Sequence, residues 1–329
     1  MDIEKTIRWG ILGPGKIAHS FAKDLALVED GKLVAVASRN LGRASDFANE
    51  YGAEHAFGSY EELLCSEQVD VIYIATPHTA HAEWAIKAMQ HGKHILCEKP
   101  LGISLTEVQK IVAAAAENKV FLMEALWSRF NPSLRKVKEL VENDSIGKVC
   151  HLYADFGFYA LHKDEEGRLL NIELAGGSIL DIGIYPIFLA YFILGKPQRI
   201  LSTSNFYKTG AEVQTAMIFE YSEAQAVLYS GLVSKTEMKA EISGHKGEIF
   251  IDPRWHETQG FTLEINEAQE RFELPTLGKG YTHEIDEVHN CLRAGKLQSD
   301  LWSHQNSIDL ITIMDEVRRQ GNIIFPFEQ

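Results

Sequence analysis

The first third of the chain alternates between short apolar runs and segments with helical spacing. In the segments between the runs, apolar residues recur every three or four positions. The expected strands are 6–12, 32–37, 69–75, 94–97 and 120–123, and the expected helices are 16–28, 41–51, 79–91 and 104–118. Apolar strands that alternate with helices predict a parallel sheet covered on both faces.

The pattern changes after about residue 125, where most apolar runs follow one another without a helix between them. The expected strands are 149–159, 199–207, 213–221, 225–233, 239–243 and 248–252, and the expected helices are 131–142, 178–194, 281–293 and 304–319. Such a succession predicts a mixed or antiparallel sheet. The run 225–233 is apolar on both faces, so we expect helices to cover one face of this sheet and a second subunit the other. We predict two domains, 1–124 and 125–329.

Composition agrees with this division and excludes some classes of protein. The 329 residues are 45% hydrophobic and 24% charged, which is the ordinary balance of a globular chain with room for two domains. The formal net charge is −14, and an acidic chain with no long basic run is a poor candidate for binding nucleic acid or an anionic membrane. No apolar run reaches the roughly 18 residues of a membrane helix.

The beginning of the chain and its cysteines favour a cytoplasmic protein. The first residues lack the charged and then apolar layout of a signal peptide. The cysteines lie far apart and form no C-x-x-C pair, and they are Cys65, Cys97, Cys150 and Cys291. We expect free or buried thiols in a reducing compartment.

A glycine-rich turn follows the first expected strand. Its residues fit G-x-G-x-x-G/A between a strand and a helix, and they are Gly13, Pro14, Gly15, Lys16, Ile17 and Ala18. The first glycine permits a tight turn, the second lets the backbone approach a pyrophosphate, and the helix N-terminus offers N–H groups to the phosphates. An ordinary strand–helix turn is the alternative. We predict a Rossmann dinucleotide-binding domain over 1–124, with cofactor contacts from Gly13 to Ile17.

The turn after the second expected strand contains no acidic residue between positions 31 and 45. NAD-binding folds usually place a carboxylate there to hold the ribose 2′-hydroxyl. This turn contains Ser38, Arg39 and Arg43 instead, and an arginine pairs with a 2′-phosphate that a carboxylate would repel. Two solvated arginines are the alternative. We expect these three residues to contact NADP, with NAD the less favoured cofactor.

The turn after the central expected strand contains candidate residues for the nicotinamide side of the cofactor. These are Thr76, Pro77, His78 and His81. Ligands of open α/β sheets bind at the carboxyl ends of the strands, so we expect this turn to line the nicotinamide. Neither this His-x-x-His nor the one at 91–94 has a carboxylate or thiol at ligand spacing, so we expect no metal.

The next turn, Glu98-Lys99-Pro100, has a lysine at the carboxyl end of a strand. A lysine facing a cleft can hold a substrate hydroxyl and lower the pKa of a neighbouring acid, whereas a surface ion pair with Glu98 is the alternative. We expect Glu98 and Lys99 to contact the cofactor. Trp127 and Arg129 follow the last expected strand of the first domain, where we expect both to contact the cofactor and Trp127 also the substrate.

Together, the glycine turn, Thr-Pro-His-x-x-His and Glu-Lys-Pro resemble the glucose-fructose oxidoreductase, inositol dehydrogenase and rhizopine-catabolism (Gfo/Idh/MocA) family over essentially the whole chain. The family's lysine matches Lys99. Its signature D-x-G-x-H matches the run from Asp181 to Tyr185, with tyrosine in place of the commoner histidine. That departure and the segment 123–130 resemble the branch of dimeric dihydrodiol dehydrogenase and NADP-dependent D-xylose dehydrogenase, in which the tyrosine is taken as the general acid/base.

The resemblance implies that an α+β domain with an open, mostly antiparallel sheet, residues 125–329, follows the Rossmann domain. In the family this domain binds the substrate and often mediates oligomerisation. We therefore expect a homodimer or homotetramer formed through the C-terminal sheet.

The chemistry of alcohol oxidation gives these residues roles. The reaction needs a hydride acceptor and a base for the hydroxyl proton. A tyrosine hydroxyl has an ordinary pKa of about 10, and a nearby ammonium such as Lys99 would stabilise the phenolate. Asp181 lies four residues before Tyr185, so both can project from one helix face, where Asp181 would orient Lys99 or bind a substrate hydroxyl. A helix cap and a core tyrosine are the alternatives.

Three aromatic residues near the first strand of the second domain are substrate candidates, with structural packing as the alternative for the first two: Phe156, Phe158 and His162. We predict an NADP-dependent oxidoreductase that transfers a hydride between nicotinamide and a sugar or cyclic vicinal diol, with Lys99, Asp181 and Tyr185 catalytic. The alternatives are an NAD-linked inositol or amino-sugar dehydrogenase and a non-catalytic NADP-binding regulator.

Overall fold

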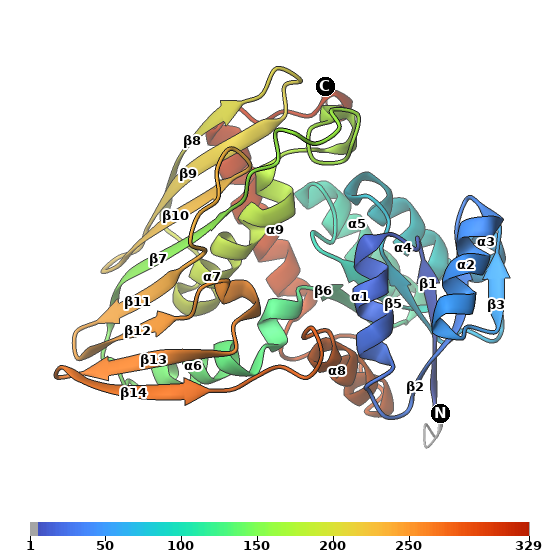
Figure 1. The fold of residues 1–329 in the computed structure, drawn as a ribbon, viewed down its shortest axis with the longest axis horizontal. Helices are drawn as coiled ribbons and strands as arrows, with labels where there is room; N and C mark the ends of the chain where they lie inside the picture. The colour runs from blue at the N-terminus through green and yellow to red at the C-terminus, as the bar shows by residue number, and fades with distance from the viewer. Residues whose placement is uncertain (1–5, 329) are drawn as a thin grey trace. The chain divides into compact units, whose positions relative to one another are not determined.

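The computed structural model describes residues 6–328, which form two compact units (Figure 1). The first unit contains the chain up to Phe130 and the segment Thr276–Ile308, and the second contains the rest. This differs from the expected division at residues 124 and 125, because the chain returns to the first unit near its end. Helix α8 (Thr282–Arg293) buries Ile285 and Val288 and contacts α1.

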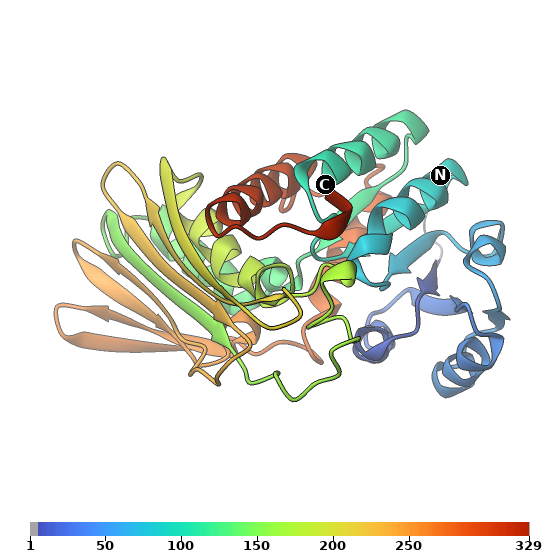
Figure 2. The same cartoon turned by 90° about the horizontal axis from the view of Figure 1, so that it is seen from above.

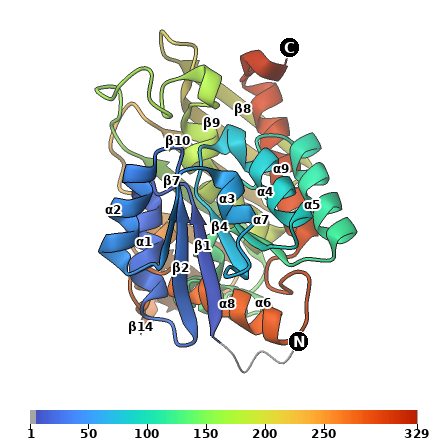
Figure 3. The same ribbon diagram turned by 90° about the vertical axis from the view of Figure 1, so that its right-hand side faces the viewer.

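The first unit contains a six-stranded parallel sheet in the order β3-β2-β1-β4-β5-β6. Its strands are β1 (Ile7–Leu12), β2 (Gly31–Ala37), β3 (His55–Phe57), β4 (Val71–Ile74), β5 (His94–Glu98) and β6 (Leu122–Ala125). Its helices besides α8 are α1 (Lys16–Leu25), α2 (Leu41–Tyr51), α3 (Tyr60–Leu64), α4 (His81–Gln90) and α5 (Leu105–Asn118), with short 3₁₀ turns η1 (His78–Ala80) and η2 (Trp127–Phe130). Figure 3 shows α1 and α2 on one face of the sheet and α4 and α5 on the other. The predicted Rossmann arrangement is confirmed.

The strand order makes β1 and β4 neighbours at the centre of this sheet. The chain leaves β1 toward β2 on one side and later returns to add β4 on the other side. The crevice outside the carboxyl ends of such a pair is where open α/β sheets bind ligands. The turns after these two strands are therefore the natural ligand site of the first unit.

The second unit contains an eight-stranded sheet in the order β14-β13-β12-β11-β7-β10-β9-β8. Its strands are β7 (Val149–Gly157), β8 (Arg199–Phe206), β9 (Glu212–Glu220), β10 (Gln225–Gly231), β11 (Ala240–Gly244), β12 (Gly247–Ile251), β13 (Gly260–Ile265) and β14 (Ala268–Glu273). Its helices are α6 (Pro132–Glu142), α7 (Ile184–Leu194) and most of α9 (His304–Gln320). Among the described strands of this second sheet, β7 and β10 alone pair in parallel, which confirms the expected open, mostly antiparallel sheet.

Helices cover one face of this second sheet. Helix α7 contacts β7 and β10, and Figure 2 shows the opposite face without a helix. On β10, Ala226 and Leu228 are buried, whereas Val227 between them is 37% exposed. The described chain therefore covers only one of the two apolar faces predicted for this strand. Helix α7 is apolar but only 11 residues long, and no described helix could cross a membrane.

Helix α8 places a carboxylic acid in the core of the first unit. Glu284 lies in its first turn, fully buried, and neither carboxyl oxygen has a hydrogen-bond partner among residues 6–328. Burial, together with the carboxylates of Glu98 and Asp24, raises the pKa of Glu284 well above its ordinary value. An ionised carboxylate without partners is costly in such surroundings, so Glu284 is held as the neutral acid.

Replacing Glu284 with glutamine removes this titration while preserving the shape of the side chain. The unfolded chain releases the proton above a pH of about 4.3, whereas the folded protein retains it. The contribution of Glu284 to stability is therefore complete below that pH and declines as the pH rises toward the raised pKa. We expect Glu284→Gln to melt at a higher temperature than the wild type at pH 8, with a smaller difference at pH 5.

Circular dichroism melting curves at the two pH values measure this difference. Glu117→Gln, an exposed acid on α5, is the control and should melt like the wild type at both. If the difference in melting temperature between Glu284→Gln and the wild type did not depend on pH, Glu284 would not be a neutral acid in the folded protein.

Candidate active site

The glycine turn opens directly onto the end of strand β4. Gly13 has a φ of +93°, and a Cβ atom on it would lie 3.2 Å from the Ala75 backbone, so only glycine suits this position. Gly15 is the N-cap residue of α1, and a Cβ atom there would meet no atom within 4 Å. Pro14, Lys16 and Ile17 are at least partly exposed around this open backbone. The free N–H groups at the start of α1 are therefore accessible to a phosphate.

The turn after β2 presents its two arginines to solvent. Arg39 and Arg43 are exposed, while Ser38 is 8% exposed and its Oγ accepts a hydrogen bond from the Asn40 N–H at 3.3 Å. The Asn40 side chain accepts the Arg43 N–H at 3.1 Å and so caps α2. This geometry leaves both guanidinium groups able to meet an anion.

The turn after β4 contains a buried hydroxyl and a buried histidine. The Oγ1 atom of Thr76 is enclosed and has no hydrogen-bond partner within the described chain. His81 is fully buried, with ring nitrogens 3.0 Å from the Thr76 carbonyl oxygen and 2.8 Å from that of Pro100. His81 thus joins two turns, and its enclosure argues against the predicted contact with the cofactor. Pro77 is exposed and His78 half-buried. Residues 6–328 contain no group of three His, Cys, Asp or Glu side chains that could hold a metal.

Lys99 directly follows the end of β5, and two buried carboxylates interact with it. Glu98 is 7% exposed and accepts a hydrogen bond from the Tyr73 hydroxyl, so its side chain points into the core, although we predicted a contact with the cofactor. Glu124 accepts hydrogen bonds from the Leu101 N–H at 2.9 Å and from two side chains. Burial raises the pKa of Glu124, while these bonds and the nearby Lys99 ammonium oppose the effect.

Trp127 and Arg129 lie on η2, directly after β6. Trp127 is 6% exposed and stacks on Tyr281, with ring centroids 5.1 Å apart. The segment before Tyr281 is held by Asp24, whose carboxylate accepts the backbone N–H groups of 279–281 at 2.8–2.9 Å. The Arg129 Nε donates to the Leu301 carbonyl at 2.8 Å. Neither Tyr281 nor Asp24 was predicted, since no local motif marks a pairing between segments so distant in sequence.

In the second unit, Tyr185 belongs to an aromatic cluster. Its ring centroid lies 5.5 Å from Phe156 and 5.3 Å from His256, and His256 stacks on Phe156 at 4.2 Å. Phe158 makes an edge contact with Phe156 at 6.5 Å. The cluster brings Tyr185 and two predicted substrate residues together and adds His256, which sequence reasoning missed. The predicted His162 is exposed and instead stacks on a neighbouring tyrosine of its own loop.

Asp181 lies on a π-helical turn, Ile179–Gly183, immediately before α7. Its Oδ1 is 2.7 Å from Nη1 of Arg168, a residue of the long loop after β7 that no sequence motif marks. Asp181 is mostly buried and Arg168 mostly exposed. Single π turns inside helices occur frequently at functional sites, because the wider turn re-aims side chains.

A buried carboxylate holds the start of this π turn. Glu212 of β9 is 1% exposed and accepts the N–H groups of Ser178 and Ile179, each at 2.9 Å. Its other oxygen accepts the hydroxyls of Ser178 at 2.8 Å and Thr215 at 2.7 Å. Burial raises the pKa of Glu212, and these four bonds lower it in part. The sheet thus fixes the segment that bears Asp181 and Tyr185.

Comparison with known proteins identifies the family. A profile described as an oxidoreductase family with an NAD-binding Rossmann fold matches residues 7–126, and the corresponding C-terminal domain profile matches residues 134–250. The chain belongs to the Gfo/Idh/MocA oxidoreductase family. Membership confirms the resemblance drawn from the three motifs.

Individual relatives match almost the whole chain. A trans-1,2-dihydrobenzene-1,2-diol dehydrogenase from Xenopus tropicalis is 34% identical over 97% of this chain and 99% of its own length. A D-xylose 1-dehydrogenase (NADP⁺) from Hypocrea jecorina is 33% identical over 98% and 93%. A solved 3-ketoreductase mutant from Actinomadura kijaniata, in complex with TDP-benzene and NADP, has a TM-score of 0.87 and 25% identity over 96% and 98%.

The first unit fits a dinucleotide by its own geometry. Gly15 leaves open space at a helix N-terminus, and the nearby Thr76 hydroxyl has no partner within the described residues. The turn after β2 has two exposed arginines and no acid. The open helix N-terminus suits a pyrophosphate, and the acid-free turn with its two arginines suits a 2′-phosphate.

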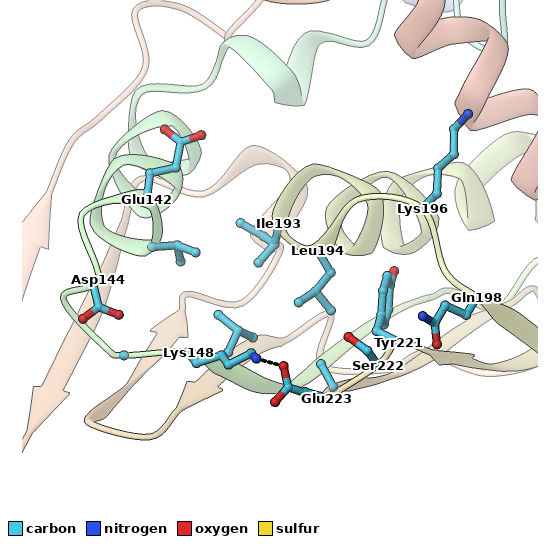
Figure 4. Close-up of a pocket in the computed structure, with 14 residues that line it drawn as sticks. Glu142, Asp144, Lys148, Ile193, Leu194, Lys196, Gln198, Tyr221, Ser222 and Glu223 are labelled. Carbon is cyan, nitrogen blue, oxygen red and sulfur yellow. Dashed lines mark ion pairs between the residues drawn. The ribbon is translucent and has the colours of Figure 1, made fainter.

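A cavity of about 540 Å³ lies elsewhere in the second unit (Figure 4). It is lined by the ends of α6 and α7, by the start of β7 and by the turn between β9 and β10. Lys148, just before β7, forms an ion pair with Glu223 of that turn. Its α7 residues, such as Ile193, are roughly 12 Å along the helix from Tyr185. The cavity therefore contains none of the predicted catalytic residues.

Replacing Glu212 with alanine tests whether this carboxylate holds the π turn. The change leaves two buried backbone N–H groups without an acceptor, each costing about 1–3 kcal/mol. We expect Glu212→Ala to lower the free energy of unfolding by about 2–6 kcal/mol in urea titrations.

Glu220→Ala removes a half-exposed acid from the same strand and serves as the control. Its ion pair with Arg199 at 3.4 Å is at the surface, so we expect a loss of less than about 1 kcal/mol. If both substitutions lowered the free energy of unfolding equally, Glu212 would not hold the π turn in the way inferred from its hydrogen bonds.

Proposed function

We propose that this protein is an NADP-dependent oxidoreductase that transfers a hydride between nicotinamide and a sugar or cyclic vicinal diol. The observation that carries the proposal is the presence of Lys99, Asp181 and Tyr185 in a chain with an intact dinucleotide turn. The relatives support it, since one is named for a cyclic diol and another for D-xylose and NADP⁺.

In this proposal the first unit binds NADP through three turns. The segment from Gly13 to Ile17 holds the pyrophosphate on the N–H groups of α1. Ser38, Arg39 and Arg43 hold the 2′-phosphate, and the turn from Thr76 to His78 lines the nicotinamide. When bound, NADP supplies the carbon that accepts or returns the hydride.

The proton is handled by the chain's own side chains. In the direction of oxidation, the Tyr185 phenolate accepts the proton of the substrate hydroxyl, and in reduction its hydroxyl returns it. The Lys99 ammonium stabilises the phenolate and the developing alkoxide by its charge. Asp181 binds a neighbouring hydroxyl of the substrate. Vicinal hydroxyls are common to sugars and cyclic diols, so one site can serve either class.

Aromatic side chains supply the apolar part of the substrate site. Phe156 and Phe158 carry faces suited to the C–H surface of a sugar or to a carbocycle. Trp127, supported by its stack on Tyr281, contributes from the first unit, and His162 from an exposed loop.

We further propose that the outer face of the second sheet binds another copy of this chain. Leu201, Ile218, Val227 and Tyr153 lie side by side on four adjacent strands. The first three are 36–39% exposed, which leaves a continuous apolar row on a sheet face without helices. Large exposed apolar rows favour association with a protein surface. The same face serves a homodimer or, with a second contact, a homotetramer.

We also propose that the protein works in the cytoplasm. All four cysteines are free, two of them buried and one exposed. Free thiols are typical of a reducing compartment.

Replacing Tyr185 with phenylalanine removes only the hydroxyl. General acid–base groups contribute about 10²–10⁴-fold, so we expect kcat to fall by roughly that factor while NADP affinity is unchanged. Steady-state assays of reduced-nicotinamide absorbance on a panel of sugars and diols measure kcat, and calorimetry measures the affinity.

The matched control is Tyr221→Phe, which removes a hydroxyl that has no partner in the described structure and lies at the far end of α7. Its kcat should equal that of the wild type. An unchanged kcat for Tyr185→Phe would exclude Tyr185 from the chemistry. Tight NADP binding by the wild type with no turnover on the whole panel would favour a regulator.

Replacing Val227 with aspartate places a charge in the middle of the apolar row. We expect the wild type to be oligomeric at micromolar concentration and Val227→Asp to be monomeric, as measured by light scattering after gel filtration. Leu297→Asp, at an apolar position of the first unit that is 42% exposed, is the control and should keep the wild-type mass. A monomeric wild type would contradict this interface.

A further inference from the structure

Two turns of the first unit leave the sheet side by side. Strands β2 and β3 pair in parallel, with Ala37 opposite Phe57 at their carboxyl ends. The Ser38 N–H donates a hydrogen bond to the Phe57 carbonyl at 3.1 Å. A Cβ atom on Gly58 would lie 3.4 Å from the Cβ of Leu41, so the second turn packs on the start of α2. The turn proposed to bind the 2′-phosphate therefore has the segment 57–60 as its direct neighbour.

Tyr60, the first residue of α3, is held at this junction by two sets of contacts. Its ring packs edge-on against Trp84, with centroids 4.8 Å apart, and the Lys87 ammonium lies 4.4 Å from the Trp84 ring. Its hydroxyl interacts with the Arg39 guanidinium. Burial raises the pKa of Tyr60 and Arg39 opposes this, with a net rise, so the hydroxyl is neutral and keeps its proton.

The contact with Arg39 does not use the O–H donor of Tyr60. A guanidinium only donates hydrogen bonds, so the Tyr60 oxygen is the acceptor in its contact with Arg39. The O–H of Tyr60 must then donate in another direction. An anion held by Arg39 would be a strong acceptor for it, because hydrogen bonds to charged groups exceed those between neutral groups.

We propose that Tyr60 determines cofactor specificity, accepting a hydrogen bond from Arg39 and donating its own to the 2′-phosphate of NADP. The inference rests on the proposed function and adds a residue that no motif marks. NAD presents a neutral hydroxyl at the same position, which gains less from the same donor. Tyr60 therefore strengthens discrimination between the cofactors without adding a charge.

Calorimetry on the full-length protein tests this with four ligands. NADP and adenosine 2′,5′-bisphosphate carry the 2′-phosphate, whereas NAD and 5′-AMP lack it. For Tyr60→Phe we expect the Kd of the first two to rise about tenfold or more, the range for losing a hydrogen bond to a charged group. The Kd of the other two should stay at the wild-type value, which also reports correct folding.

A second tyrosine and a double substitution sharpen the test. Tyr51→Phe removes a hydroxyl of the same unit that contacts His19 at 2.9 Å and should leave all four affinities unchanged. If Tyr60 and Arg39 act together, Tyr60→Phe should have a smaller effect when Arg39→Ala is already present.

The outcomes separate this inference from the proposed function. A wild type that binds NADP no more tightly than NAD overturns both. A wild type that prefers NADP, with the preference intact in Tyr60→Phe, overturns the role of Tyr60 alone. Equal weakening of all four ligands by Tyr60→Phe also overturns it, since that result indicates packing on the adenine.

Discussion

A buried carboxylate must be matched by hydrogen-bond donors, and this constraint fixes both candidate half-sites. Buried carboxylates that accept backbone N–H groups near these half-sites include those of Asp24, Glu124 and Glu212. In the first unit they fix the segment that carries the stacking partner of Trp127 and the residues just after Lys99. In the second they fix the turn before Asp181. An unmatched donor or acceptor costs about 1–3 kcal/mol, so each segment has one stable position.

Sequence patterns predicted most of the elements with strongly apolar faces, but they missed β13, although it buries Phe261 and Leu263. They also missed elements without such a face. The parallel sheet and its flanking helices follow from runs that are buried on both sides. Strand β3 has three half-exposed residues and β14 is almost fully exposed, so neither shows an alternation that a window of sequence could detect. Both exist because a neighbouring strand offers backbone partners. The return of Thr276–Ile308 to the first unit likewise depends on tertiary packing.

The same distinction applies to the candidate site. Motifs within one turn, such as Gly13 to Ile17, were predictable because the chemistry and the backbone geometry are local. His256 and Arg168 come to Tyr185 and Asp181 only through the folded second unit. A histidine between other aromatic rings and an arginine in a polar loop carry no local signal. Their placement is set by the sheet and by the π turn, which no local sequence pattern predicts.

The net charge of −14 makes the binding of an anionic cofactor a local problem. Charges at the surface are screened within about 8 Å at physiological salt, so distant carboxylates contribute little at a phosphate. Phosphate binding therefore depends on the hydrogen-bond donors within that distance, which are the N-terminus of α1 and the acid-free turn with Arg39 and Arg43. Additional cations there would bind either nucleotide more tightly, because both carry a pyrophosphate. A neutral hydroxyl aimed at one position raises selectivity instead, since its strength depends on whether the acceptor is charged. This is the physical reason for an uncharged donor beside two arginines.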